Sequence, residues 1–261
     1  MTATVVRVTP EWLARREPAD AAARSGELVE RLAGHLPATG PLVIHDLGGG
    51  DGSMGRWLAP RLRGPQHWVV HDRDADLLER AAATPPARAT VETRRSDVTR
   101  LEPHDLAGAS LIVASALLDI LSADELGRTL GACTAAGCPM LLALTVVGRV
   151  SLRPSEPLDA RVAAAFNAHQ RRLLGPDAAA AAVEALRGTG AEVLVAPSPW
   201  RLDAADAELT AEWFEGWIAA ACEQEPTLAG EARGYRERRL AQAAAGELAV
   251  RIGHVDLLVL P

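Results

Sequence analysis

A run of glycines between acidic residues is the part of this sequence with the clearest chemical meaning. It reads Asp46-Leu47-Gly48-Gly49-Gly50-Asp51-Gly52-Ser53 and follows an apolar stretch at residues 42–47. Because glycine has no Cβ atom, a ligand can approach the backbone closely there. A glycine loop between a strand and a helix is a typical ligand-binding position in α/β proteins. The pattern alone leaves the ligand open, since residues 50–55 also satisfy the G-x-G-x-x-G of nicotinamide-binding enzymes.

Three aspartates at the ends of predicted strands narrow the choice of ligand. Asp46 precedes the glycines, Asp72 ends the second strand, and Asp97 follows the third. A carboxylate at the end of the second strand can accept from both hydroxyls of a ribose, and Asp97 can accept from an amine. In this order and spacing, the residues resemble the class I S-adenosylmethionine-dependent methyltransferases over about residues 42–147. The late final strand, with residues 253–258, is also similar to that family.

The resemblance implies eight cofactor-binding residues: Asp46, Gly48, Gly50, Gly52, Asp72, Asp97, Val98 and Ser115. The three glycines would pass under the methionine part and the ribose of S-adenosyl-L-methionine, and Ser115 would face the cofactor. Asp46 would hold backbone amides or the amino group, and Asp72 the ribose hydroxyls. Asp97 and the Val98 amide would meet the adenine. Gly49 stands where the family often has cysteine, alanine or serine. We expect the glycine at this position to cost chain entropy but to threaten no contact.

Methyl transfer is a displacement at a sulfonium carbon, so the protein mainly has to align the acceptor. A hydroxyl or ammonium acceptor must also lose a proton, which a base can take. We predict His169 or Asp119 as that base, with Asn167, Trp200 and Arg16 on the acceptor side. Arg16 and Arg24 flank the first predicted helix and could clamp a carboxylate of the cofactor or the substrate. The alternatives are a solvated helix face for His169, an exposed loop acid for Asp119, and surface positions for Arg16 and Arg24.

The composition excludes several other kinds of chemistry. None of the 27 basic residues is a lysine, which removes Schiff-base enzymes, P-loop nucleotide binding and Tyr/Lys reductases. The net charge of −7 is unlike that of a nucleic-acid-binding surface. The His, Cys, Asp and Glu residues show no spacing typical of a metal site, so we expect no metal.

Strands that alternate with helices predict an α/β fold with a doubly wound, mostly parallel sheet and helices on both faces. Seven strands are predicted, near residues 42–47, 67–71, 89–94, 110–115, 140–147, 191–196 and 248–260. The family resemblance implies that the last of these runs antiparallel. We expect an N-terminal helical cap at residues 1–40, interrupted near Pro18 and Gly26, and a Rossmann-like methyltransferase domain at residues 41–261. Ser122 and Glu125 have the Ser-x-x-Glu spacing of a capping box at the start of a helix. Helical insertions at about residues 148–175 and 197–246 would form a lid.

The predicted function is therefore a methyltransferase that transfers a methyl group from S-adenosyl-L-methionine to an O, N or C atom of a small organic acceptor, leaving S-adenosyl-L-homocysteine. The alternatives are an NAD(P)-dependent oxidoreductase and a non-catalytic cofactor-binding module. Residues 129–148 are uncharged, but Gly131, Gly137 and Pro139 interrupt them, which argues against a membrane span. Three unpaired cysteines are typical of a cytoplasmic protein. We expect neither a nucleic-acid nor a membrane partner, and the sequence leaves monomer or homodimer open.

Overall fold

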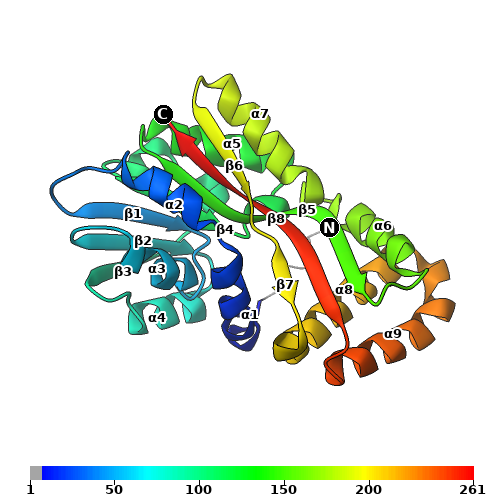
Figure 1. Ribbon diagram of the computed structural model, residues 1–261. Helices are drawn as coiled ribbons and strands as arrows, with labels where there is room; N and C mark the ends of the chain where they lie inside the picture. Colours follow the sequence, from blue (N-terminus) through cyan, green and yellow to red (C-terminus); the bar gives the residue numbers. More distant parts are fainter. Residues whose placement is uncertain (1–7) are drawn as a thin grey trace.

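Seven strands of the computed structural model, which describes residues 8–261, lie side by side in the order β3-β2-β1-β4-β5-β8-β6 (Figure 1). A short eighth strand, β7, pairs with β8. The strands are β1 (Leu42–Leu47), β2 (Gln66–Asp72), β3 (Ala89–Arg95), β4 (Leu111–Ser115), β5 (Met140–Arg153), β6 (Glu192–Pro197), β7 (Trp200–Leu202) and β8 (Ala249–Leu260). Neighbours among β1–β5 pair in parallel, whereas β8 is antiparallel to β5, β6 and β7. The predicted mostly parallel sheet with an antiparallel last strand is confirmed, and β7 adds a strand.

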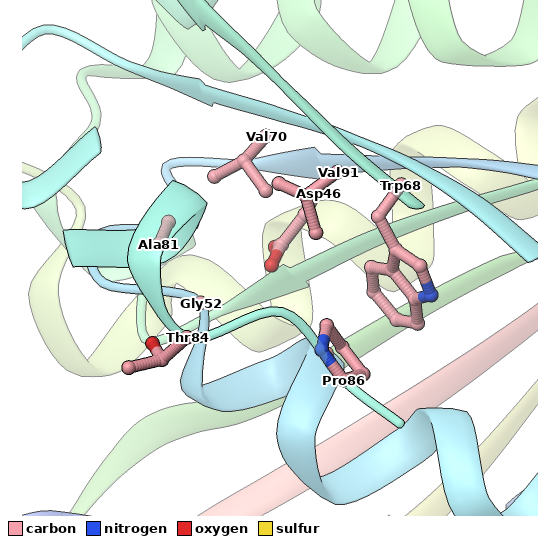
Figure 2. Close-up of a pocket in the computed structure, with 9 residues that line it drawn as sticks. Asp46, Gly52, Trp68, Val70, Ala81, Thr84, Pro86 and Val91 are labelled. Atoms are coloured by element: carbon pink, nitrogen blue, oxygen red, sulfur yellow. The ribbon is translucent and has the colours of Figure 1, made fainter. Parts of the chain in front are cut away.

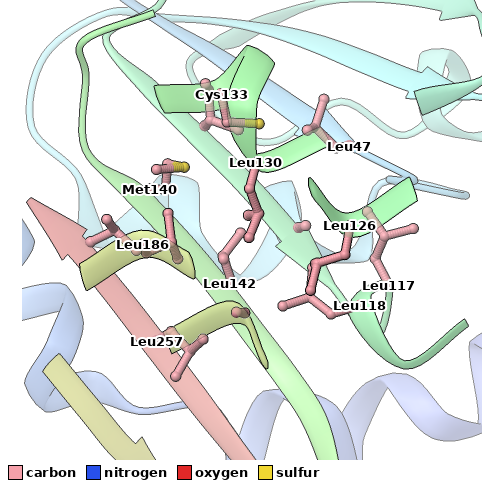
Figure 3. Close-up of a cluster of buried hydrophobic side chains, with 14 of the residues drawn as sticks. Leu47, Leu117, Leu118, Leu126, Leu130, Cys133, Met140, Leu142, Leu186 and Leu257 are labelled. Carbon is pink, nitrogen blue, oxygen red and sulfur yellow. The ribbon is translucent and has the colours of Figure 1, made fainter. Parts of the chain in front are cut away.

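Helices cover both faces of this sheet, as predicted. They are α1 (Pro10–Ala23), α2 (Gly26–Ala33), α3 (Ser53–Leu58), α4 (Ala75–Ala83), α5 (Ala123–Ala135), α6 (Asp159–Gln170), α7 (Ala178–Gly188), α8 (Ala207–Gln224) and α9 (Ala229–Ala244). On one face, Leu130 of α5 and Leu186 of α7 pack on strand residues such as Leu142 (Figure 3). On the other face, Leu32 of α2 and Leu58 of α3 pack in a second cluster.

Local sequence signals set the helix ends. The Thr9 hydroxyl accepts from the Trp12 amide at the start of α1, and Ser122 and Glu125 form the predicted capping box of α5. Helix α1 runs through Pro18, so the predicted interruption there is wrong. The break comes at Arg24, whose backbone leaves the helical region before Ser25 caps α2. No helix within residues 8–261 is long and apolar enough to cross a bilayer.

The fifth strand is longer than predicted. It continues past Val147 to Arg153, with two shifts in its pairing to β8, so residues 148–153 belong to the sheet. This extension, the first half of β8, and β7 pack against α6, α8 and α9 around a third apolar cluster. The first predicted insertion thus holds α6, and the second holds β7, α8 and α9.

The carboxylate of Asp256 on β8 ties two distant segments to the sheet. Its Oδ1 accepts from the Leu144 amide at 2.8 Å, and its Oδ2 accepts from the Ser25 amide at 2.7 Å. Leu144 has a positive φ of 55° at the bulge of β5, and Ser25 follows the break between α1 and α2. Asp256 is buried, so no solvent would replace these bonds.

We therefore expect Asp256→Ala to lower the free energy of unfolding by about 2–4 kcal/mol, because it leaves one buried and one part-buried amide without an acceptor. Urea denaturation would measure the loss. Glu247→Ala, an exposed acid just before the same strand, is the control and should change little. A loss for Asp256→Ala no larger than that of the control would show that this carboxylate does not hold the two segments.

Candidate functional site

The glycine loop leaves β1 at Leu47 and enters α3 at Ser53. Three of its glycines have positive φ: 65° at Gly48, 55° at Gly50 and 86° at Gly52. Side chains other than glycine rarely adopt this conformation, so the backbone geometry requires these residues. The Gly49 amide donates to the carbonyl of His71 on β2 at 3.1 Å, which anchors the loop to the neighbouring strand.

Gly49 is required for a different reason. A Cβ atom there would lie 2.7 Å from the carboxyl group of Asp46 and 2.8 Å from Cγ1 of Val70. Real Cβ contacts are essentially never that short. Glycine is therefore the residue that fits here, because in this chain the loop lies directly on the Asp46 carboxyl group. The expectation that a glycine at this position threatens no contact stays a prediction.

Asp46 is fully buried and has no hydrogen-bond partner for either carboxylate oxygen among the described residues. Burial raises its pKa to about 7, although the charge of Arg24 acts in the opposite direction. The predicted bonds from Asp46 to backbone amides are thus not formed. The carboxyl group instead borders a cavity of about 10 Å³ under the loop, together with Val70, Trp68 and Ala81 (Figure 2). This volume suits about one water molecule.

Asp72 ends β2, and its carboxylate faces the loop. Its Oδ2 accepts from the Gly50 amide at 3.0 Å, and its Oδ1 accepts from the Asp74 amide at 2.9 Å. Asp97 follows β3, where its Oδ1 accepts from the amide and the hydroxyl of Thr99 at 3.0 and 2.7 Å. The structure thus places Asp72 and the glycines in direct contact, with Asp97 at the end of the next strand, beside the buried Val98.

Arg24 is the residue that sequence reasoning misplaced. It is buried, and its NH2 group donates to the hydroxyl of Ser115, at the end of β4, at 3.1 Å. The Nε and NH1 groups of Arg24 have no acceptor within residues 8–261. The guanidinium also lies 5.5 Å from the ring of Trp57. The surface alternative is therefore wrong for Arg24, which brings a buried cation to the same strand edge as the glycine loop.

Arg16 and Trp200 lie together where α1 packs on β7. Arg16 makes a two-pronged ion pair with Asp20, at 2.9 and 3.2 Å, and Asp20 also accepts from Nε1 of Trp200 at 2.9 Å. Trp200 is only 3% exposed, within the third apolar cluster. Both side chains have protein partners here, and their predicted acceptor role stays a prediction.

The predicted acceptor residues of α6 also have protein partners. The side-chain amide of Asn167 donates to the carbonyl of Gly148 at 2.8 Å. It therefore holds the second register shift of β5, between Val146 and Val150. Nε2 of His169 lies 3.3 Å from a carboxylate oxygen of Glu223 on α8, whereas its Nδ1 is buried without a partner. His169 therefore has one paired and one unpaired ring nitrogen.

Asp119 lies in a short 3-10 helix, Leu118–Ile120, that follows β4. Its Oδ1 is buried and has no partner among the described residues, and burial raises its pKa. The charge of Arg16 acts to lower that pKa. The alternative of an exposed loop acid is therefore wrong.

Within residues 8–261, no three His, Cys, Asp or Glu side chains form a group that could hold a metal ion.

We expect Gly49→Ala to destabilise the protein by about 1–3 kcal/mol, because its Cβ atom would overlap the Asp46 carboxyl group and Val70. The matched control is Gly127→Ala on α5, where a Cβ atom meets nothing within 4 Å. That change should stabilise the helix by about 0.5–1 kcal/mol. Thermal and urea unfolding would measure both, and equal effects at the two glycines would contradict the close approach of the loop.

Comparison with known proteins gives a likeness in structure only. No protein-family model matches the chain, and no curated protein matches its sequence. The cyclopropane synthase MmaA2 from Mycobacterium tuberculosis aligns over 97% of this chain and 94% of its own, with a TM-score of 0.52 and 11% identity.

Two solved S-adenosylmethionine-dependent methyltransferases, both in complex with S-adenosyl-L-homocysteine, are also similar. The protein from Thiobacillus denitrificans has a TM-score of 0.48 and 15% identity, over 98% of this chain and 100% of that one. The protein from Geobacter sulfurreducens has a TM-score of 0.47 and 16% identity, over 97% and 98%. The strand order and the alignment with the cyclopropane synthase show that this chain has the fold of the class I S-adenosylmethionine-dependent methyltransferases.

Proposed function

We propose that this chain transfers a methyl group from S-adenosyl-L-methionine to an O, N or C atom of a small organic acceptor. The observation that carries the proposal is the buried Arg24, with two unpaired nitrogen groups beside Ser115. A guanidinium binds a carboxylate through two parallel hydrogen bonds, and the methionine part of this cofactor ends in a carboxylate. Arg24 would therefore bind the carboxylate of the cofactor at the end of β4, on the same edge of the sheet as Asp72 and the glycine loop.

The other site residues fit the rest of the molecule. The glycines of the loop carry no side chain that would keep a ligand away, and Asp72 would accept from ribose hydroxyls. Asp97 and the Val98 amide would meet the adenine. The bound cofactor supplies a methyl group on a positively charged sulfur. The protein's part is to hold the acceptor in line with that methyl and to keep water out.

The strand order argues against the nicotinamide alternative. Dinucleotide-binding sheets have the order 3-2-1-4-5-6 with the strands parallel. Here the antiparallel β8 lies between β5 and β6, which that arrangement lacks. The G-x-G-x-x-G match is therefore better explained by the sharp turns at Gly50 and Gly52 than by NAD(P) binding.

The acceptor side of the proposal rests on Asp119 and His169. Each presents a buried polar atom without a partner in the described part of the chain, Oδ1 of Asp119 and Nδ1 of His169. A buried carboxyl group and an imidazole nitrogen without a hydrogen-bond partner can each accept a proton from the methyl acceptor. Arg16 lies on α1, and Arg24 lies between α1 and α2. These two helices would then serve as a cap over the site.

Calorimetric titration with S-adenosyl-L-homocysteine and with NADH tests the cofactor. We expect Arg24→Met to weaken S-adenosyl-L-homocysteine binding by about 10- to 100-fold, the size of losing hydrogen bonds to a charged group. Binding of 5′-methylthioadenosine, which lacks the amino-acid part, should stay the same in both proteins. Arg61→Met is the matched control, because Arg61 lies over the same Trp57 ring but is exposed. Tight NADH binding without any response to S-adenosyl-L-homocysteine would overturn the proposal.

The two candidate bases can be separated by their effect on turnover. With an acceptor found in a panel of small hydroxyl and amine compounds, removal of the true base should lower kcat by about 10²- to 10⁴-fold and leave cofactor affinity unchanged. We expect this result for His169→Ala or for Asp119→Asn. The control is Arg172→Ala, since Arg172 also pairs with Glu223. Wild-type kcat in both variants would remove both residues as bases.

A further inference from the structure

Two buried histidines and a serine form a hydrogen-bonded row across the carboxyl ends of the first three strands. Nδ1 of His45 lies 2.9 Å from Nε2 of His71, and Nδ1 of His71 lies 3.1 Å from the hydroxyl of Ser96. The two rings are stacked, with their centroids 5.1 Å apart. Each member of the row stands immediately before one of the three aspartates, Asp46, Asp72 and Asp97. Because side chains alternate along a strand, His45 and His71 face away from the aspartates that follow them.

The two contacts of the row allow neutral imidazoles with the protons running in either direction. When the Ser96 hydroxyl donates to the carbonyl of Arg94, 3.4 Å away, its lone pairs are left to accept from Nδ1–H of His71. Nε2 of His71 then carries no proton and accepts from Nδ1–H of His45. Both imidazoles are neutral in this arrangement, each in a single tautomer.

The backbone of His71 extends the row to the glycine loop. Its carbonyl accepts from the Gly49 amide at 3.1 Å, and the carbonyl of Asp72 accepts from the Ser96 amide at 2.9 Å. The Asp72 carboxylate in turn accepts from the Gly50 amide. The end of β2 is therefore held by side-chain bonds from both neighbouring strands, at the residue that anchors the loop.

We propose that His45 and His71 are positioning residues: the row His45–His71–Ser96 aligns the ends of three strands and so sets the glycine loop and its aspartates in the geometry that binds the cofactor. The role in binding rests on the proposed function, whereas the alignment itself concerns this chain alone. An apolar pair of the same size would fill the space but would leave the three strand ends without this fixed register.

The row also makes the site sensitive to acid. Burial lowers the pKa of both histidines to about 4. The charged or titratable groups that also act on them are Arg94, Glu92 and Asp105, together with His67 for His45 and His45 for His71. Since the ordinary value is 6.5, the unfolded chain binds more protons between pH 6.5 and 4, and folding loses stability as the pH falls through this range. A proton on Nε2 of His71 would also remove the acceptor for His45.

The experiment uses Ser96→Ala and His71→Phe in the full chain, with S-adenosyl-L-homocysteine as the probe at pH 8. We expect binding to weaken about tenfold for His71→Phe and severalfold for Ser96→Ala, the size of losing one or two hydrogen bonds. Ser96→Thr keeps the hydroxyl and should restore wild-type affinity. The control is His67→Phe, since His67 lies on the same strand but is partly exposed and bonded to Thr90. Wild-type affinity in both test variants would overturn the proposal.

A readout without cofactor separates this proposal from the proposed function. We expect the Gly49 and Gly50 amides to exchange hydrogen at least about tenfold faster in Ser96→Ala than in the wild type, since their acceptors would be less firmly held. The wild-type stability should also fall more steeply between pH 6.5 and 4 than that of His71→Phe. If the wild type does not bind S-adenosyl-L-homocysteine, the proposed function fails, and unchanged exchange at both amides would refute the alignment by itself.

Discussion

Asp256 provides the constraint on which the candidate site depends. One buried carboxylate accepts from an amide at the break between α1 and α2 and from another at the bulge of β5. The first bond fixes the residue that follows Arg24, and so sets where that guanidinium enters the site. The second stabilises a leucine in the left-handed region, which lets β5 change register and continue. Both the buried cation and the second lobe, which α6, α8, α9 and β7 form around the third apolar cluster, depend on this side chain.

The site holds polar groups that a protein built for stability alone would not leave unpaired. Asp46, Arg24 and Asp119 each have buried atoms without partners in the described part of the chain. Each such atom costs the folded state the hydration that it loses on burial. A ligand that supplies the missing partners would recover this cost, so the same groups that destabilise the protein by itself would favour binding of a ligand with complementary polar groups.

The sequence predicted the elements that depend on local pattern. Strand β1 and the capping box of α5 are examples, because an apolar run and a capping pair need no distant partner. The end of β5 was predictable in part, since Val150 and Leu152 alternate with polar residues. Strand β7 has only three residues, too few for a pattern.

The site was predictable to the extent that it lies on strand ends and glycines. The burial of Arg24 was not, because it depends on a helix break that Asp256 holds from more than 200 residues away along the chain. The need for Gly49 was also out of reach, since it depends on a distance between the loop and Asp46. The hydrogen bonds of Asn167 and Trp200 come from tertiary contacts that no spacing in the sequence reveals. The pair of Arg16 and Asp20, in contrast, has the i,i+4 spacing of neighbours on one helix.

The long antiparallel pair of β5 and β8 has a mechanical consequence. The same two strands contribute Leu142 and Leu257 to the core beside α5 and α7, and Leu152 and Val250 to the core beside α8 and α9. The two lobes are therefore joined by a continuous two-stranded ribbon, which resists opening because bending it would break backbone hydrogen bonds. Its pairing shifts register twice, between Leu142 and Thr145 and between Val146 and Val150, and the ribbon can twist at these two places. Asp256 holds the first through the Leu144 amide, and Asn167 holds the second through the Gly148 carbonyl.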